Sequence, residues 1–70
     1  MKYLIIIEPT RTGFSAYSPD IPGCVATGQT EAETKEMMIE AIGFHLEGII
    51  EAGLPIPASL TKADYVEIAA

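Results

Sequence analysis

Apolar positions in the first part of the chain follow the two-residue period of β-strands. Lys2–Glu8 is apolar at almost every position, which indicates a strand buried on both faces and therefore central in a sheet. Phe14–Ser18 alternates between two faces, and Cys24–Thr27 is a further short run of strand-forming residues. Pro9–Gly13 then joins the first two strands as a hairpin loop. The pattern predicts three consecutive strands.

Between the second and third predicted strands, Asp20–Gly23 carries the residues of a tight turn. Pro22 fixes φ near −65° and Gly23 accepts a positive φ, so the pair suits the central positions of a type II turn. We expect the Asp20 carboxylate to accept hydrogen bonds from nearby backbone N–H groups and so to fix the turn. Thr30 and Glu33 are spaced as a capping box, which predicts the start of a helix.

The longest predicted element is a helix over Glu31–Ala52, followed by Gly53 as its left-handed stop. The prolines of Leu54–Pro57 exclude helical geometry from the residues before them, so this segment leads out in extended form. A fourth strand is predicted at Asp64–Ala69. We expect one domain, 1–70, of class α+β, with two layers and the order β-β-β-α-β. A right-handed crossover would place the fourth strand parallel to the first, in a mostly antiparallel sheet of order 3-2-1-4.

The predicted helix carries more apolar surface than one sheet needs. A core stripe follows the helical period, glutamates gather on the opposite side, and a second apolar row lies between them. Either the long loops and Leu54–Leu60 fold over this row, or a second protein chain covers it. We predict self-association, as a homodimer or higher homo-oligomer, through the helix flank, the uncovered sheet face or both. The core stripe is Met38, Ile42, Leu46 and Ile49, the second row is Met37, Ala41, Phe44 and Gly48, and the glutamates are Glu33, Glu36, Glu40, Glu47 and Glu51.

The charge balance narrows the range of partners. Four basic residues face ten acidic ones, for a formal net charge of −6, so we expect no direct binding to nucleic acid. A basic protein is the complementary partner, and the glutamates form either a solvated helix face or a docking surface for it. No apolar run reaches the ~18 residues that span a membrane, and the N-terminus lacks the features of a signal peptide. The single Cys24 fits a reducing cytoplasm.

Side chains suited to catalysis do not form a recognisable set. Cys24 and His45 are the only residues of their types, and nucleophilic catalysis needs a base and a third group that orients it. Both are more simply interpreted as packed side chains. A metal-dependent nuclease needs clustered carboxylates, for which the candidates are Glu8, Asp20, Asp64 and Glu67. The turn already explains Asp20, and we expect no enzyme activity, catalytic residue, metal site or cofactor.

Several stretches taken together resemble the HicB-like antitoxin family. Its members show a Pro-Asp-hydrophobic-Pro-Gly-Cys turn, which stands here at Pro19–Cys24, and a Gly-(Asp/Glu/Gln)-Thr helix entry, here Gly28–Thr30. The helix segment Ala41–Gly48 and the exit Glu51–Pro57 are also similar to those of the family. The resemblance covers roughly residues 3–58, and the combined pattern is specific.

This resemblance implies a partial RNase H-like fold without its catalytic residues. It also implies that the chain binds and neutralises a small, basic HicA-like toxin, an mRNA-cleaving ribonuclease, by masking its active site or RNA surface. The alternative is an orphan oligomeric interaction domain with a different protein partner. Many members carry a C-terminal DNA-binding segment, which we do not expect here because the sequence stops at Ala70. We expect the partner to contact Asp20, Ile21, Pro22, Gly23, Glu36, Glu40, Phe44 and Glu47.

Overall fold

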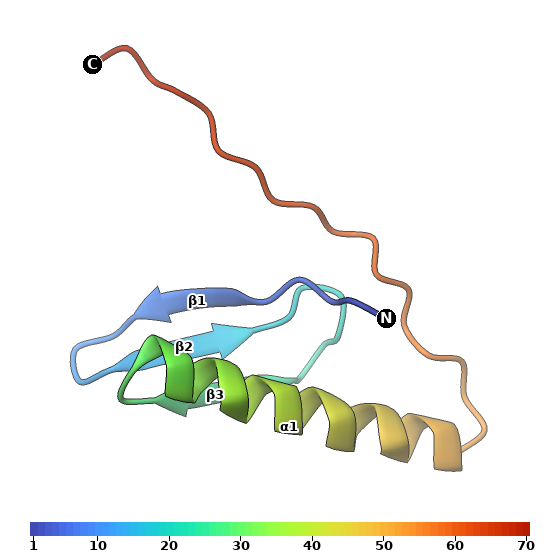
Figure 1. Cartoon of the computed structure of the whole chain (residues 1–70). Helices are drawn as coiled ribbons and strands as arrows, with labels where there is room; N and C mark the ends of the chain where they lie inside the picture. The colour runs from blue at the N-terminus through green and yellow to red at the C-terminus, as the bar shows by residue number, and fades with distance from the viewer.

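A three-stranded antiparallel sheet and one helix make up the fold in the computed structural model, which describes residues 1–70. The elements are β1 (Ile6–Pro9), β2 (Phe14–Tyr17), β3 (Val25–Gly28) and α1 (Glu31–Glu51). The strand order is β1-β2-β3, so β2 is central and β1 is an edge strand, contrary to its predicted central position. α1 packs on one face of the sheet, which gives two layers (Figure 1). The α+β class and the antiparallel meander are confirmed.

β1 is shorter than the predicted strand over Lys2–Glu8. Its ladder with β2 begins at the pair Ile6 and Tyr17. Beyond Tyr17 the chain reaches Pro19, which has no N–H group to donate to a ladder. The Ser18 hydroxyl instead donates to the Leu4 carbonyl oxygen at 2.8 Å. A side-chain hydrogen bond therefore holds the N-terminal residues where the ladder stops.

The turn between β2 and β3 has the predicted type II geometry. The Cys24 N–H donates to the Ile21 carbonyl oxygen at 3.3 Å, and Gly23 has φ of 80°. A second turn precedes it, in which the Ile21 N–H donates to the Ser18 carbonyl oxygen at 3.2 Å. Two successive turns thus reverse the chain and place Ile21 inside the domain, where its side chain is 1% exposed.

Both ends of α1 are capped by the residues that the sequence indicates. The Thr30 hydroxyl accepts from the Glu33 N–H at 3.0 Å, which is one half of the predicted capping box. At the other end Gly53 has φ of 72°, and its N–H donates to Ile50. The Leu54 N–H donates to Ile49, which completes a Schellman motif. α1 ends at Glu51, one residue before the predicted end.

The core lies between the sheet and the inner face of α1. Its buried apolar residues are Ala16 from β2, Ile21 and Cys24 from the turn, and Met38 from α1. Of the predicted core stripe, Met38 is fully buried, while Ile42, Leu46 and Ile49 are half-buried. The side of the helix that faces the core was therefore predicted correctly, but the C-terminal half of the stripe projects past the sheet. Only 6 of the 70 residues are buried, so most of the apolar surface of the chain is still open.

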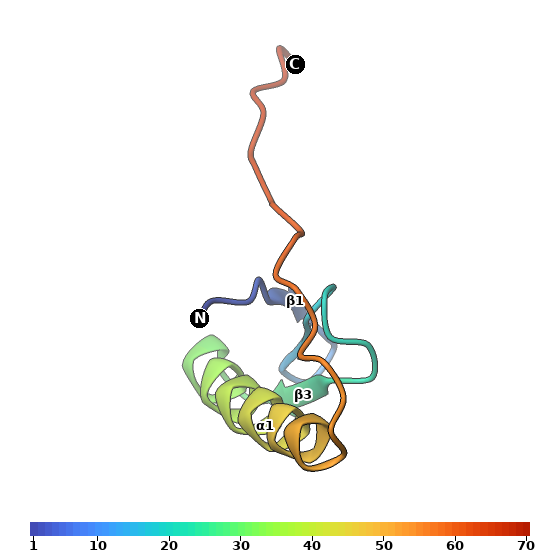
Figure 2. The ribbon, with the colours of Figure 1, turned by 90° about the vertical axis from the view of Figure 1, so that its right-hand side faces the viewer.

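The residues after the helix form no helix or strand. They run from the end of α1 past the N-terminal residues and then away from the sheet, as both ribbon views show (Figures 1 and 2). The radius of gyration is 14.0 Å, against the roughly 11 Å expected for a compact chain of this length. The prediction of a fourth strand at Asp64–Ala69 within this sheet is therefore wrong for the single chain. A β-strand needs a neighbouring strand to hydrogen-bond with, and this segment has none because the chain runs away from its own sheet.

Candidate protein-interaction surface

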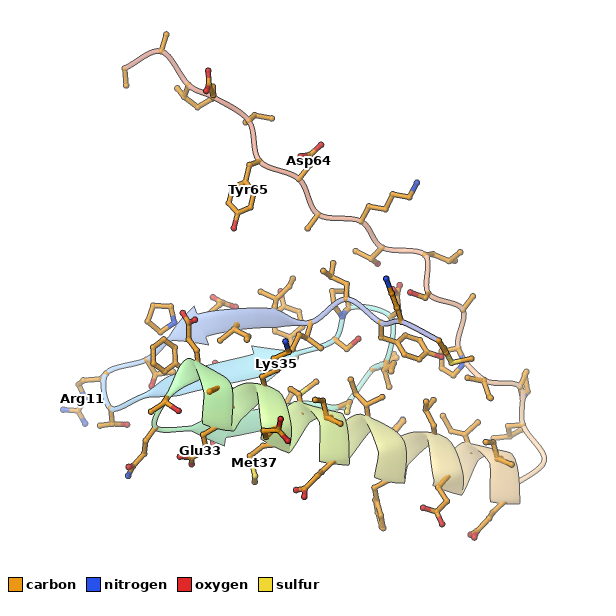
Figure 3. The ribbon with its side chains drawn as sticks, in the orientation of Figure 1. Arg11, Glu33, Lys35, Met37, Asp64 and Tyr65 are labelled. Atoms are coloured by element: carbon orange, nitrogen blue, oxygen red, sulfur yellow. The ribbon has the colours of Figure 1, made fainter.

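The outer face of α1 carries one continuous stripe of exposed acidic and apolar side chains. Its members are spaced alternately four and three residues apart, which keeps them on one side of a helix. Phe44 is 81% exposed and Met37 is 46% exposed, and each has glutamates before and after it along the stripe. Glu33 and Met37 point away from the sheet (Figure 3). We define this outer stripe as Glu33, Met37, Glu40, Phe44, Glu47 and Glu51.

The structure decides between the two explanations of the second apolar row. The exposure of Phe44 shows that neither the loops nor the segment Leu54–Leu60 covers it, so that interpretation is wrong. Within the row, Ala41 packs against the core, while Phe44 lies among the glutamates rather than beside the core stripe. The outer stripe therefore places two exposed apolar side chains, Met37 and Phe44, among exposed carboxylates.

Of the eight predicted contact residues, six are exposed, Asp20 is half-buried and Ile21 is buried. Glu36, Glu40, Phe44 and Glu47 are exposed on α1. Pro22 and Gly23 are exposed at the tip of the turn, whereas Ile21 is a core residue. Because Ile21 has almost no accessible surface, it supports the turn from inside and offers nothing to a partner.

Asp20 has a role that local turn chemistry did not predict. Its carboxylate does not fix its own turn; it accepts hydrogen bonds from the segment that follows the helix. The Thr61 hydroxyl donates to Oδ1 at 2.7 Å, and the Thr61 and Leu60 N–H groups donate to Oδ2 at 3.1 and 3.2 Å. Nearby, the Tyr3 hydroxyl donates to the Pro57 carbonyl oxygen at 2.5 Å. We refer to the contacts of Asp20 with Leu60 and Thr61 as the Asp20 clamp.

The electrostatics of Asp20 agree with this geometry. The hydrogen bond from the Thr61 hydroxyl, followed by those from the Thr61 and Leu60 backbone, lowers the pKa of the Asp20 carboxyl below its ordinary 3.8. The carboxylate is therefore ionised and engaged within the chain at neutral pH. The turn serves as the anchor of the C-terminal segment, and only Pro22 and Gly23 remain free at its surface.

The remaining candidates for chemistry are dispersed. Cys24 is 4% exposed, and its burial raises the pKa of the thiol, which disfavours the thiolate needed for reactivity. His45 is half-buried on α1, and no three His, Cys, Asp or Glu side chains are placed to share a metal ion. α1 does not have the length and apolar character that would let it cross a membrane.

These features define a class of protein, a small two-layer α+β domain with a mixed acidic and apolar helix face open to solvent. Within that class, the chain belongs to the HicB_like antitoxin family of bacterial toxin–antitoxin systems, whose model matches residues 3–68. The resemblance seen in the sequence is thereby confirmed, and it extends through the C-terminal segment.

The chain is also similar to a phage protein and to a chain of a solved complex. It is 38% identical over 66 residues to an uncharacterized 14.9 kDa protein in the rep-hol intergenic region of Haemophilus phage HP1 (strain HP1c1). That match covers 94% of this chain and 50% of the phage protein, so the chain spans about half the length of this curated relative. A solved structure titled HicA3 and HicB3 toxin-antitoxin complex contains a chain that matches with a TM-score of 0.72 and 37% identity, over 86% of this chain and 70% of that one.

Proposed function

We propose that this chain is a non-catalytic, antitoxin-type protein that binds and neutralises a small HicA-like mRNA-cleaving toxin. The observation that carries this proposal is the match, at 37% identity, to a chain of a solved toxin–antitoxin complex. Family membership over residues 3–68 gives independent support. The buried thiol of Cys24 and the dispersed carboxylates favour a binding role over a chemical one.

The outer stripe of α1 is the proposed docking surface. An mRNA-cleaving toxin needs a basic surface for RNA, and an acidic helix face complements it and speeds the encounter. Phe44 and Met37 then supply the apolar contacts that a purely acidic face lacks, since binding energy concentrates in a few large side chains that lose water on docking. The exposed tip of the turn at Pro22 and Gly23 is the second proposed contact. Ile21 supports this turn from the core, and Asp20 holds the C-terminal segment beside it.

Charge reversal on the outer stripe tests this docking surface. In a binding assay with a HicA-like toxin, the variant Glu40→Lys/Glu47→Lys should bind at least about tenfold more weakly, and wild-type binding should weaken with salt. A matched control is Glu8→Lys/Glu31→Lys, which changes the net charge equally at exposed positions off the stripe. Phe44→Ala should lower affinity without the salt dependence. If both double variants bind equally, attraction between net charges explains the binding and the stripe is not the contact.

Three further properties belong to this proposal. The net charge of −6 supports a protein that acts on the toxin and makes no contact with nucleic acid itself. The lone buried cysteine supports action in the cytoplasm. The exposed apolar residues on both sides of α1 support a homo-oligomer, and an RNase H-like sheet of order 3-2-1-4 requires that a fourth strand be added beside β1.

A further inference from the structure

The C-terminal segment has the side-chain pattern of an amphipathic strand but pairs with no other strand. Residues 58–70 are all exposed, and within them Tyr65, Val66 and Ile68 are 99%, 79% and 76% exposed. Because side chains alternate along an extended chain, Val66 and Ile68 share one face while Tyr65 and Glu67 share the other. A fully apolar pair on one face is the pattern of a half-buried strand, and in the single chain nothing buries it.

The free edge of β1 and the groove next to it are suited to bind such a strand. β1 is an edge strand, so the side turned away from β2 has no neighbour in the sheet. Next to it, a groove of about 470 Å³ opens between the N-terminal residues and α1. The groove is mostly apolar, and its floor includes Tyr3, Ile5, Met38, Ile39, Ile42 and Leu46.

Charge also matches the segment to the groove. The chain has only four Lys and Arg residues, and two of them, Lys2 and Lys35, line this groove. Lys35 is the only Lys or Arg of α1, and the outer stripe on the opposite side of the helix is acidic. Of the two carboxylates in the segment, Asp64 lies on the same face as Val66 and Ile68, whereas Glu67 lies on the face of Tyr65. An acidic strand with an apolar face therefore complements an apolar groove that has a basic rim.

The segment does not occupy the groove of its own chain. The Asp20 clamp, together with the hydrogen bond from Tyr3 to Pro57, fixes the point where it leaves the domain. From that point Figures 1 and 2 both show it running outward beyond the β1 edge. Nine residues follow Thr61, and in extended form they reach about 30 Å, which is enough to cross to a neighbouring molecule.

We propose that Asp64–Ala69 of one copy adds as a strand beside β1 of a second copy, with Val66 and Ile68 over its groove. A twofold axis makes the exchange reciprocal, so that both edge strands and both grooves are covered. Each sheet then has the order 3-2-1-4, with the fourth strand supplied by the other chain. This strand exchange rests on the self-association named under the proposed function and specifies its contact surface. It does not depend on toxin binding.

The oligomeric state of the full chain and of a chain that ends at Lys62 tests the exchange. The shortened chain keeps the Asp20 clamp and every residue of the core, and circular dichroism verifies that it is folded. Light scattering should give a mass of two chains for the full protein and of one chain for the shortened one, with the dissociation constant raised at least about 100-fold.

Substitutions at matched positions test the groove in the full-length protein. Ile39 lines the groove and is 56% exposed, while Ile50 lies outside it on the same helix and is 59% exposed. Ile39→Asp should separate the dimer, and Ile50→Asp should leave the mass at two chains. Equal behaviour of the two variants would place the contact elsewhere.

A spin label on the segment determines whether pairing is within or between chains. Two samples are mixed. The first is the variant Ala69→Cys without isotope label, which carries a nitroxide at position 69 because Cys24 is buried and slow to react. The second is isotope-labelled wild-type protein. Broadening of β1 amide signals in the isotope-labelled copies can only come from the segment of another copy. Absence of that broadening in a dimeric protein overturns the exchange.

The outcomes separate this proposal from the rest of the function. A full-length chain that is monomeric at high micromolar concentration refutes both the exchange and the self-association. A shortened chain that remains dimeric refutes the exchange alone. Co-purification with the toxin is measured separately on both chains, so its failure refutes toxin binding and leaves the exchange unaffected.

Discussion

Adding a single methyl group at a glycine should have opposite effects on stability at different positions. Gly43 and Gly48 lie inside α1, and a Cβ built on either one meets no atom within 4 Å. A Cβ on Gly28 would instead lie 2.6 Å from Thr34 Oγ1 and 2.9 Å from the Thr34 backbone nitrogen. Gly28 does not have positive φ, so its requirement for glycine is steric. Substitution by alanine therefore adds a methyl group to open space at Gly43 and Gly48, and to a close contact between β3 and α1 at Gly28.

The magnitudes follow from these surroundings. A glycine inside a helix costs about 0.8–1.0 kcal/mol relative to alanine, and with no clash at Gly43 or Gly48 each variant should recover that amount. The two positions do not touch, so the double variant should gain about 2 kcal/mol, or roughly 8–16 °C in Tm for a domain of this size. Gly28→Ala forces the start of α1 away from β3 and should lose about 1–3 kcal/mol.

Urea denaturation followed by circular dichroism measures all three variants at one protein concentration. Repeating the series on the chain that ends at Lys62 separates the stability of the fold from that of any assembly. The reasoning fails if Gly28→Ala is as stable as wild type, or if neither Gly43→Ala nor Gly48→Ala raises the free energy of unfolding. The first result would show that β3 and α1 are free to separate, and the second that the helix interior is not limited by its glycines.

Two further perturbations probe the core and the Asp20 clamp. Met38 is fully buried, so Met38→Ala should lower the free energy of unfolding by about 2–5 kcal/mol in a denaturant titration. Asp20→Asn and Thr61→Val should each speed amide hydrogen exchange at Thr61 while the exchange of β2 stays unchanged. Because hydrogen bonds lower the pKa of Asp20 in the folded state below 3.8, the clamp is complete above that pH and is lost as pH falls through the lowered pKa. In Asp20→Asn the exchange at Thr61, corrected for its intrinsic pH dependence, should show no such transition.

Local signals in the sequence predicted the local structure well. The pair Pro22 and Gly23 determines the turn, and Thr30 and Gly53 mark the helix ends, because each acts through its own backbone geometry. The helical period likewise identified Met38 as a core residue. In each case the physical cause lies within a few residues of its effect, so the local sequence is enough to predict the local structure.

The errors concern interactions between distant parts of the chain. Turn chemistry assigned the Asp20 carboxylate to its neighbours, but its partners lie 40 and 41 residues later, and no local signal at Asp20 distinguishes the two arrangements. The pattern at Asp64–Ala69 predicted a strand that the single chain does not form, because alternation along a segment does not define the edge beside which it would pair. Phe44 was assigned to a row between the core stripe and the glutamates, but at about 100° per residue it falls on the same side of the helix as Glu40 and Glu47, where it is exposed.

The small size of the chain limits how much apolar surface its own core can bury. A chain of this length is near the lower limit for a self-sufficient core, and here it leaves Phe44, Tyr65, Val66 and Ile68 largely in water. Gly43 and Gly48 weaken the helix although nothing in the chain packs against them. Surfaces of this kind gain stability only on binding, since a partner that binds the folded state alone stabilises it by mass action. The outer stripe and the C-terminal segment lie on different sides of the molecule (Figure 3), so the proposed toxin contact through α1 and the proposed contact with a second copy through β1 do not compete for the same surface.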